Sequence, residues 1–288
     1  MTGILRTQLT QGLNWFRYRI QRLSVFQPLV RRLRTGKIKT GVGADLWFFA
    51  GDSTPEYRLG CNEMPVQETI GHYTKPGDVF YDIGANVGFF TVIAARIVGE
   101  AGHVYSFEPV PENIQVFEYN IQANGFRNVT LFKQAVSNVS GNGQLQLARY
   151  SGGASLASAV PPPDYTGAMP VKLVAVDDLI AEKRAVPPTF VKIDVEGAEL
   201  EVLQGMEQTL RLYRPSILFE IDDSREERFQ KKAEACSSYL QSFGYHVESL
   251  ANSYPNSGWL VGHFFALFPR YNQLDWPNPV GVEKQWLG

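Results

Sequence analysis

The stretch DVFYDIGANVGFFTVIAARIVG, residues 78–99, decides the fold. Its apolar residues 79–81 predict a buried strand, and a glycine-spaced turn follows directly at 82–88. An apolar helix is then expected over 87–98, ending at Gly99. Because backbone amides are accessible in such a turn, the unit is typical of a sheet that binds a small molecule at the end of its first strand.

The glycine turn begins with an acid. A nicotinamide-binding turn needs G-x-G-x-x-G, so that its amides can approach a pyrophosphate. Here Asp82 occupies the first glycine position, where a carboxylate would repel a diphosphate but suit a ligand with a cationic part. Gly84 permits a tight turn and close approach to a ligand, and Asn86 tolerates unusual dihedral angles. Gly88 opens the helix against the sheet.

A second acid, Glu108, ends the expected strand 103–108, 20 residues beyond Gly88. A carboxylate at this point can accept hydrogen bonds from both hydroxyls of a ribose. Together with Asp82 it indicates an adenosine-type ligand that is cationic and lacks phosphate, which is S-adenosylmethionine. The structural alternatives are a helix-capping role for Asp82, compatible with cofactor binding, and a solvated loop carboxylate for Glu108.

Strand and helix signals alternate through most of the chain. This order predicts an α/β fold, a mostly parallel seven-stranded sheet with helices on both faces and an antiparallel C-terminal strand. Two short strands are expected within 45–60 and a helix within 62–74. A proline-rich loop is expected at 150–170. The other expected strands are 129–136, 141–147, 171–176, 190–194, 216–221, 245–250 and 263–268.

Carboxylates follow several of these strands, at the sheet edge where ligands bind. If the methyl group of this ligand is passed to a hydroxyl, a side chain must take the hydroxyl proton. The candidate bases are Asp194, Glu196, Glu199, Glu220, Asp222 and His72. We favour Asp194 and Glu196 as catalytic residues because both follow the central fourth strand.

Three alternatives remain open for these acids. Glu196 and Glu199 also suit the first turn of a helix, where acids are favourable. Asp194 could orient the cofactor, or hold Mg²⁺ together with Glu220 or Asp222 in a metal-assisted reaction. Lys192 shares a strand face with Asp194 and is expected to pair with an acid, since a buried unpaired lysine is costly.

Charge is uneven along the chain. Nine basic residues and no acid precede Asp45, whereas the whole chain has a net charge of −2. The basic residues alternate with apolar ones and predict an amphipathic helix over much of 1–40, which either lies on an anionic membrane surface or packs across the body of the protein. Cys61 and Cys236 are expected to be free thiols, and the sequence predicts no metal cluster.

Five segments resemble the FkbM-type family of class I S-adenosylmethionine-dependent methyltransferases: PGDVFYDIGANVGFFT (76–91), VYSFEPVPENIQVFEYNIQANG (104–125), VTLFKQAVSN (129–138), VAVDDLI (174–180) and FVKIDVEGAELEVLQGM (190–206). The resemblance implies a Rossmann-like fold and O-methylation of a sugar, glycan precursor or polyketide. It also implies residue roles. Asp82, Gly84, Asn86 and Gly88 would line the methionine end of the cofactor, Glu108 would hold the ribose, Ala135 would pass near the adenine, and Asp194 and Glu196 would face the methyl group.

Other classes of protein fit less well. The (N/D/S)-P-P-(Y/F) turn of amino-directed nucleic-acid methyltransferases is absent after residue 193, and the body is acidic, so no nucleic-acid partner is expected. A non-catalytic binding module with the same fold is the rival hypothesis. We expect a basic segment (1–40), an extension that caps the substrate side (41–75), a methyltransferase domain (76–270) and a tail (271–288). The expected location is cytoplasmic, with peripheral contact at the inner membrane face through residues 1–40, and no oligomeric state is predicted.

Overall fold

The computed structural model describes residues 34–269, except positions 52, 54–55, 150 and 255–258. The predicted basic helix falls mostly on residues 1–33 and the predicted tail on 271–288, so both lie outside the described residues. Within the described part of the chain, no helix combines the length and apolar character that crossing a membrane requires.

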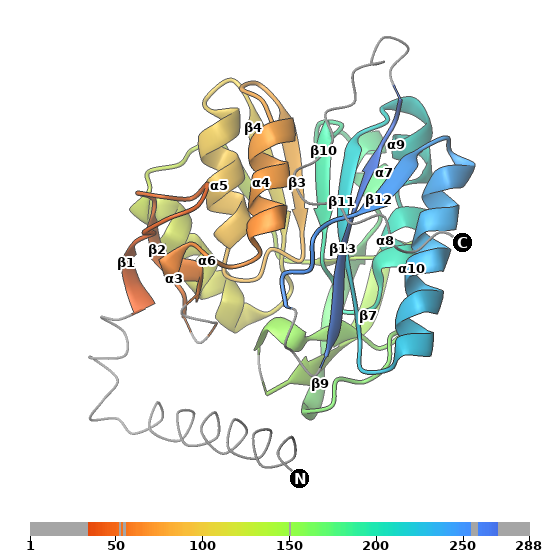
Figure 1. Cartoon of the computed structure of the whole chain (residues 1–288). Coiled ribbons are helices and arrows are strands. Elements are labelled where there is room, and N and C mark those ends of the chain that lie inside the picture. Colours follow the sequence, from red (N-terminus) through yellow and green to blue (C-terminus); the bar gives the residue numbers. More distant parts are fainter. Residues whose placement is uncertain (1–33, 52, 54–55, 150, 255–258, 270–288) are drawn as a thin grey trace.

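The centre of the molecule is a seven-stranded sheet (Figure 1). The neighbouring strands β10, β3, β4 and β5 are parallel, β11 is parallel to β10, and β13 runs antiparallel to both β11 and β12. This confirms the predicted fold class. In sheet order the strands are β12 (His246–Ser249), β13 (Leu260–Leu267), β11 (Ser216–Asp223), β10 (Phe190–Ile193), β3 (Val79–Ile83), β4 (His103–Phe107) and β5 (Val129–Phe132).

Helices cover both faces of this sheet, which explains why its central strands are almost entirely apolar. Alternate residues of β3 enter two different cores: Phe80 packs on one side, and Tyr81 and Ile83 pack on the other. The first core includes α4 (Met64–Tyr73) and α5 (Phe89–Val98), beside α6 (Pro111–Ala123). The second includes α7 (Val176–Ala181), α8 (Glu199–Gln204), α9 (Glu207–Leu212) and α10 (Glu226–Ser242).

A second, four-stranded sheet is inserted between β5 and β10. Its order is β6 (Ala135–Val136), β9 (Tyr165–Val174), β7 (Gly141–Ala148) and β8 (Ser155–Leu156). The expected single strand over 129–136 is therefore wrong. The chain leaves the main sheet after Phe132, and Ala135 and Val136 pair with β9 instead. Part of the expected loop 150–170 is also strand, because β9 already begins at Tyr165.

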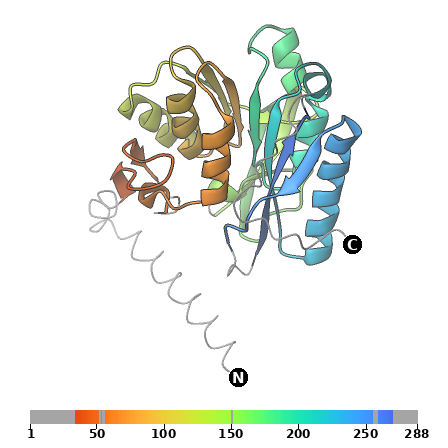
Figure 2. The same cartoon turned by 45° about the horizontal axis from the view of Figure 1, so that its top comes forward.

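The N-terminal extension lies beside α6, as Figures 1 and 2 show. Its strand β2 (Trp47–Phe49) pairs with β1 (Thr35–Lys37), and α3 (Glu56–Leu59) follows. The prediction of two strands within 45–60 is wrong, because the partner of β2 precedes it in the chain. Asn120 of α6 holds this extension: its side chain accepts a hydrogen bond from the Phe49 N–H and donates to the Phe49 and Val87 carbonyls.

Replacing Asn120 by Ala is expected to lower the free energy of unfolding by about 3 kcal/mol, because one buried and two partly buried backbone groups lose their partner. Chemical denaturation monitored by circular dichroism measures this change. Gln115→Ala, at an exposed position of the same helix, is the control and should change stability by less than about 0.5 kcal/mol. Equal stabilities of the two variants would contradict this role of Asn120.

The helical spacing of Leu200, Leu203, Met206 and Leu210 predicts one helix after β10, but the structure divides it into α8 and α9 at Gly205. A Cβ atom at this position would lie 2.1 Å from the Ser137 backbone oxygen, so the close approach of the neighbouring loop requires glycine there. The N-terminus of α9 is then capped from outside: the Asp177 carboxylate accepts hydrogen bonds from the N–H groups of Gln208 and Thr209. The apolar spacing alone gave no sign of the break.

Candidate active site

The glycine turn between β3 and α5 has a tight backbone. Gly84 and Gly88 have left-handed angles (φ 82° and 86°), and so does Asn86 (φ 48°). A Cβ atom at Gly84 would lie 1.7 Å from the Asp194 backbone oxygen, so only glycine fits at this position. The turn therefore packs directly against the chain that leaves β10.

The Glu108 carboxylate fastens this turn to the end of β4. Its Oε2 accepts a hydrogen bond from the Asn86 N–H (2.8 Å), and its Oε1 accepts from the Val110 N–H (2.8 Å) and the Asn113 side-chain amide (3.2 Å). Burial raises the pKa of Glu108 to about 7, although these donors act in the opposite direction. Oε1 already accepts two hydrogen bonds, whereas Oε2 accepts one and has a second lone pair that can accept a hydrogen bond from a ligand.

Asp82 lies inside the sheet. It is 1% exposed, and its Oδ2 accepts a hydrogen bond from the Thr91 hydroxyl (2.5 Å). Lys192, directly opposite in β10, places its Nζ 4.0 Å from Asp82 Oδ1 and 3.0 Å from Asp194 Oδ2. The predicted pairing of Lys192 with an acid is therefore confirmed. Burial raises the pKa of Asp82, and Lys192 opposes that rise.

One cavity brings together most of the predicted cofactor residues, at the carboxyl ends of β3, β4 and β10. Its cavity volume is about 50 Å³, or about 500 Å³ when all non-atom space, including open solvent at its mouth, is counted. Its polar lining comprises Gly84, Asn86, Glu108, Asn113, Asp194 and Glu196, and its apolar lining includes Val110, Ala135, Val136, Leu145 and Leu156. Neither Asp82 nor Gly88 is part of this lining. Gly88 instead faces Phe117, whose ring lies 2.8 Å from the position of a Cβ atom.

Glu196 stands where this cavity meets a second pocket and lines both. Its backbone is left-handed (φ 57°), which is uncommon for a residue other than glycine and is typical of functional sites. Its carboxylate makes no hydrogen bond to any other residue that the structure describes. Burial, followed by the neighbouring charges of Asp222 and Asp194, raises the pKa of Glu196 well above the usual carboxylate range.

The other candidate bases have different surroundings. Glu199 is buried, and its Oε1 accepts a hydrogen bond from the Gly197 N–H (2.8 Å), so it stabilises the turn after β10. Asp222 accepts a hydrogen bond from the Trp259 indole N–H (2.6 Å). His72 is exposed on α4 and lines neither pocket. Among these candidates Glu196 best combines access to the cavity with a free carboxylate.

The second pocket is larger, with a cavity volume of about 500 Å³, or about 1340 Å³ when open solvent at its mouth is included. The proline-rich stretch 160–164 forms one wall, and the aromatic rings of Tyr254 and Trp259 form another. Its acidic lining residues are Asp164, Glu196, Glu220, Asp222 and Asp223, and its basic ones are Arg228 and Lys232. Because Asp223 already pairs with both basic residues, the charge left over in this pocket is negative.

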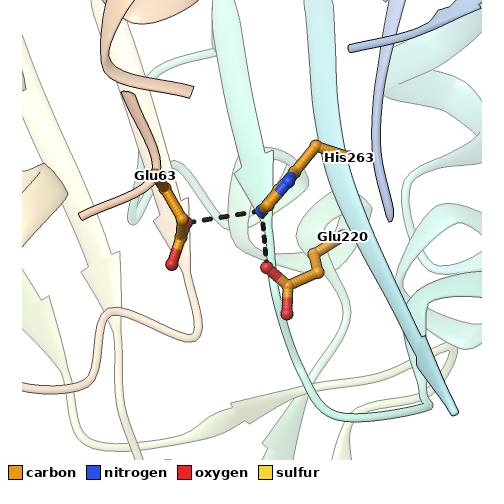
Figure 3. A group of neighbouring side chains, drawn as sticks. All are labelled: Glu63, Glu220 and His263. Atoms are coloured by element: carbon orange, nitrogen blue, oxygen red, sulfur yellow. Dashed lines mark ion pairs between the residues drawn. The ribbon is translucent and has the colours of Figure 1, made fainter. Parts of the chain in front are cut away.

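Sequence reasoning missed a buried cluster beside this pocket, formed by Glu63, Glu220 and His263 (Figure 3). The His263 Nε2 atom lies 2.7 Å from Glu220 Oε2 and 3.4 Å from Glu63 Oε2. Burial lowers the pKa of His263, but the two carboxylates raise it to about 10. The histidines have no ligand spacing along the chain; only the β11–β13 register places His263 directly opposite Glu220.

The sheet order, the glycine turn and the acid after the second parallel strand are those of a class I methyltransferase, as the sequence predicts. Residues 82–247 match the family model described as the methyltransferase FkbM domain. The chain belongs to the FkbM methyltransferase family. It is therefore an S-adenosylmethionine-dependent methyltransferase, which confirms the prediction of enzyme class and methyl donor.

Relatives of known activity cover much of this chain. The hexuronic acid methyltransferase AglP of Haloferax volcanii is 27% identical over 187 residues, which span 62% of this chain and 74% of AglP. The 31-O-demethyl-FK506 methyltransferase FkbM of Streptomyces tacrolimicus is 29% identical over 160 residues, 46% of this chain and 61% of that protein.

A solved structure of methyltransferase FkbM from Methylobacillus flagellatus KT is 16% identical to this chain, with a TM-score of 0.45. The similarity covers 73% of this chain, which spans about half (52%) of that protein.

Proposed function

We propose that the protein transfers the methyl group of S-adenosylmethionine to a hydroxyl of a sugar, glycan precursor or polyketide-like molecule. The observation that carries this proposal is the cavity, where residues from four separate segments that the sequence singled out lie together: Gly84 and Asn86, Glu108, Ala135, and Asp194. The names of AglP and FkbM describe methyl transfer to a hexuronic acid and to 31-O-demethyl-FK506. Both names are consistent with an oxygen acceptor.

The polar groups that line the cavity suit those of S-adenosylmethionine. Asn86 lines it, and the buried side-chain oxygen of Asn86 has no hydrogen-bond partner among the described residues. Glu108 Oε2 accepts one hydrogen bond and keeps a free lone pair, which a ribose hydroxyl can use as an acceptor. The carboxylate of Asp194, fixed by Lys192, gives the cavity a negative charge that suits a sulfonium and an ammonium group.

Glu196 is proposed as the general base. When bound, S-adenosylmethionine supplies an electrophilic methyl group, and the protein must align a hydroxyl with it and remove the hydroxyl proton. Glu196 lies at the junction of the two pockets and has a free carboxylate with a raised pKa, so it is a stronger base than an exposed glutamate. Asp194, held by Lys192, is then a positioning group rather than the base.

The second pocket is proposed to hold the acceptor. Carboxylates accept hydrogen bonds from hydroxyls, and aromatic rings cover the apolar face of a sugar or macrocycle. Arg228 and Lys232 both pair with Asp223, and the acidic side chains of this lining outnumber the basic ones, so the pocket does not favour an acidic acceptor. We therefore favour a neutral polyhydroxyl acceptor over a free uronate.

The proposed function is tested by incubating the purified protein with methyl-labelled S-adenosylmethionine and fractionated cell extract. The proposal expects label in a fraction of glycan precursors or small polyhydroxyl molecules, in an ether linkage that survives mild base. Label that is lost under mild base would indicate a methyl ester and contradict transfer to a hydroxyl.

The basic segment is proposed to bring the enzyme to anionic lipid. Deleting residues 1–33 removes six of the nine basic residues that precede Asp45. This deletion should abolish co-sedimentation with vesicles containing anionic lipid, because each such residue contributes about 1 kcal/mol at the surface. Neutral vesicles serve as the control, and binding should weaken as salt is added. Unchanged partitioning of the truncated protein would remove the membrane hypothesis.

A further inference from the structure

We propose that Glu63, Glu220 and His263 bind one divalent transition-metal ion at the inner wall of the second pocket. The three residues come from separate elements: Glu63 precedes α4, Glu220 lies in β11 and His263 lies in β13. Figure 3 shows their polar ends directed toward one another. One ligand atom from each residue lies within 4.8 Å of the others.

The separations are those of a ligand set that can close around an ion. Ligands about 2.1 Å from a tetrahedral metal are about 3.4 Å from one another. The distances from His263 Nε2 are 3.4 Å to Glu63 Oε2 and 2.7 Å to Glu220 Oε2, so small side-chain rotations suffice to admit an ion. One imidazole and two carboxylates suit Zn²⁺, Mn²⁺ or Co²⁺, whereas Mg²⁺ prefers oxygen ligands alone.

The hydrogen bonding of Glu63 is a second, independent observation that favours a cation site. Glu63 is 8% exposed, and its Oε1 accepts hydrogen bonds from the Tyr254 hydroxyl (2.7 Å) and the Asn62 amide (2.9 Å). Its Oε2, in contrast, is buried with no hydrogen-bond partner among the described residues and faces His263.

The imidazole of His263 has the same feature. The ring is 3% exposed, and its Nε2 lies close to both carboxylates but makes a well-directed hydrogen bond to neither. Its other nitrogen, Nδ1, lies 3.5 Å from the Ser253 hydroxyl, so a separate group can orient the ring, as is usual for metal ligands. Glu63 Oε2 and His263 Nε2 thus lie 3.4 Å apart as an ion pair, and neither atom makes a well-directed hydrogen bond to a described residue.

The alternative is an imidazolium that bridges the two carboxylates and needs no metal. The charges around the cluster allow either state, because the nearby Lys192 is engaged by Asp82 and Asp194.

Three protein ligands leave one coordination position open. Since Glu220 and Tyr254 line the second pocket, an ion here would be accessible to the acceptor, a consequence that rests on the proposed function.

The test uses the full-length protein, stripped with a chelator and then dialysed against Zn²⁺, Mn²⁺, Co²⁺ or Mg²⁺ separately. Elemental analysis should find one Zn²⁺ or Co²⁺ per chain and no retained Mg²⁺, and bound Co²⁺ should give the visible absorption of a nitrogen- and oxygen-ligated ion. Glu63→Gln, Glu220→Gln and His263→Gln should each lower the affinity by about 100-fold or more. His72→Gln, at an exposed histidine, is the matched control.

Folding of each variant is checked by circular dichroism and by its thermal shift with S-adenosylhomocysteine, which binds at a different site. Tyr254→Phe removes one donor to Glu63 and leaves all three ligands, so it should retain the metal. This variant keeps the proposal testable where a ligand variant fails to fold. Failure of the wild-type protein to retain any of the ions, or equal retention by wild type and by a folded His263→Gln, would overturn the metal site in favour of the imidazolium. Neither result depends on methyl transfer.

Discussion

Glu108→Ala is expected to abolish the rise in melting temperature that S-adenosylhomocysteine gives to the wild-type protein. A hydrogen bond from a ribose hydroxyl to a carboxylate contributes up to about 3 kcal/mol, so its loss should weaken binding by about 100-fold. The wild type should gain about 2.7 kcal/mol at a ligand concentration of 100 times Kd. Differential scanning fluorimetry with increasing ligand measures both proteins.

The control for this prediction is Glu112→Ala, at an exposed acid in the first turn of α6. Glu108→Ala also removes the partner of the Asn86 and Val110 N–H groups, so its melting temperature without ligand should fall as well. Asn86→Ala keeps Glu108 and provides a second test of the cavity. A full ligand-dependent shift in both Glu108→Ala and Asn86→Ala would contradict the cofactor site.

Glu196→Gln is expected to lower kcat for methyl transfer by about 10²–10⁴-fold, the usual contribution of a general base. Binding of S-adenosylhomocysteine should change little, because no hydrogen bond to a described residue is lost. The measurement is label transfer to the acceptor identified by the extract screen, with Glu182→Gln, an exposed surface acid, as the control. Retention of most of the wild-type rate by Glu196→Gln would transfer the role of base to another residue.

The pH dependence of kcat gives a separate check on Glu196. A base works only when it is ionised, so the rate should rise with pH as the Glu196 carboxyl loses its proton. Because burial and neighbouring carboxylates raise its pKa, this rise should occur well above the pH at which exposed glutamates ionise. In Glu196→Gln this limb of the profile should vanish. A flat wild-type profile through the same region would contradict the assignment.

Periodic features of the sequence predicted the parallel sheet and the cofactor turn. The strand at 79–83, the glycines at 84 and 88 and the acid at 108 are local signals, and each is tied to the backbone path around it. The second sheet was harder to predict. Apolar spacing indicates a strand at 135–136 but does not indicate which sheet contains it, since pairing with β9 depends on residues more than 35 positions away.

The sequence predicted some of the side-chain contacts across the sheet but not others. Lys192 was expected to pair with an acid because one strand carries both it and Asp194, and the pair is present. The pairing of Lys192 with Asp82 needs the β3–β10 register, which no local pattern encodes. The cluster of Glu63, Glu220 and His263 needs three such long-range placements. The three residue types can be read along the chain, but no spacing links them.

The most direct measurement for the whole account is a crystal structure of the protein with S-adenosylhomocysteine. The account predicts the ligand in the cavity lined by Gly84, Asn86 and Glu108, with its ribose hydroxyls within hydrogen-bond distance of the Glu108 carboxylate and its sulfur directed toward Asp194 and Glu196. Ligand bound elsewhere, or a cavity that stays empty in crystals grown with saturating ligand, would contradict it.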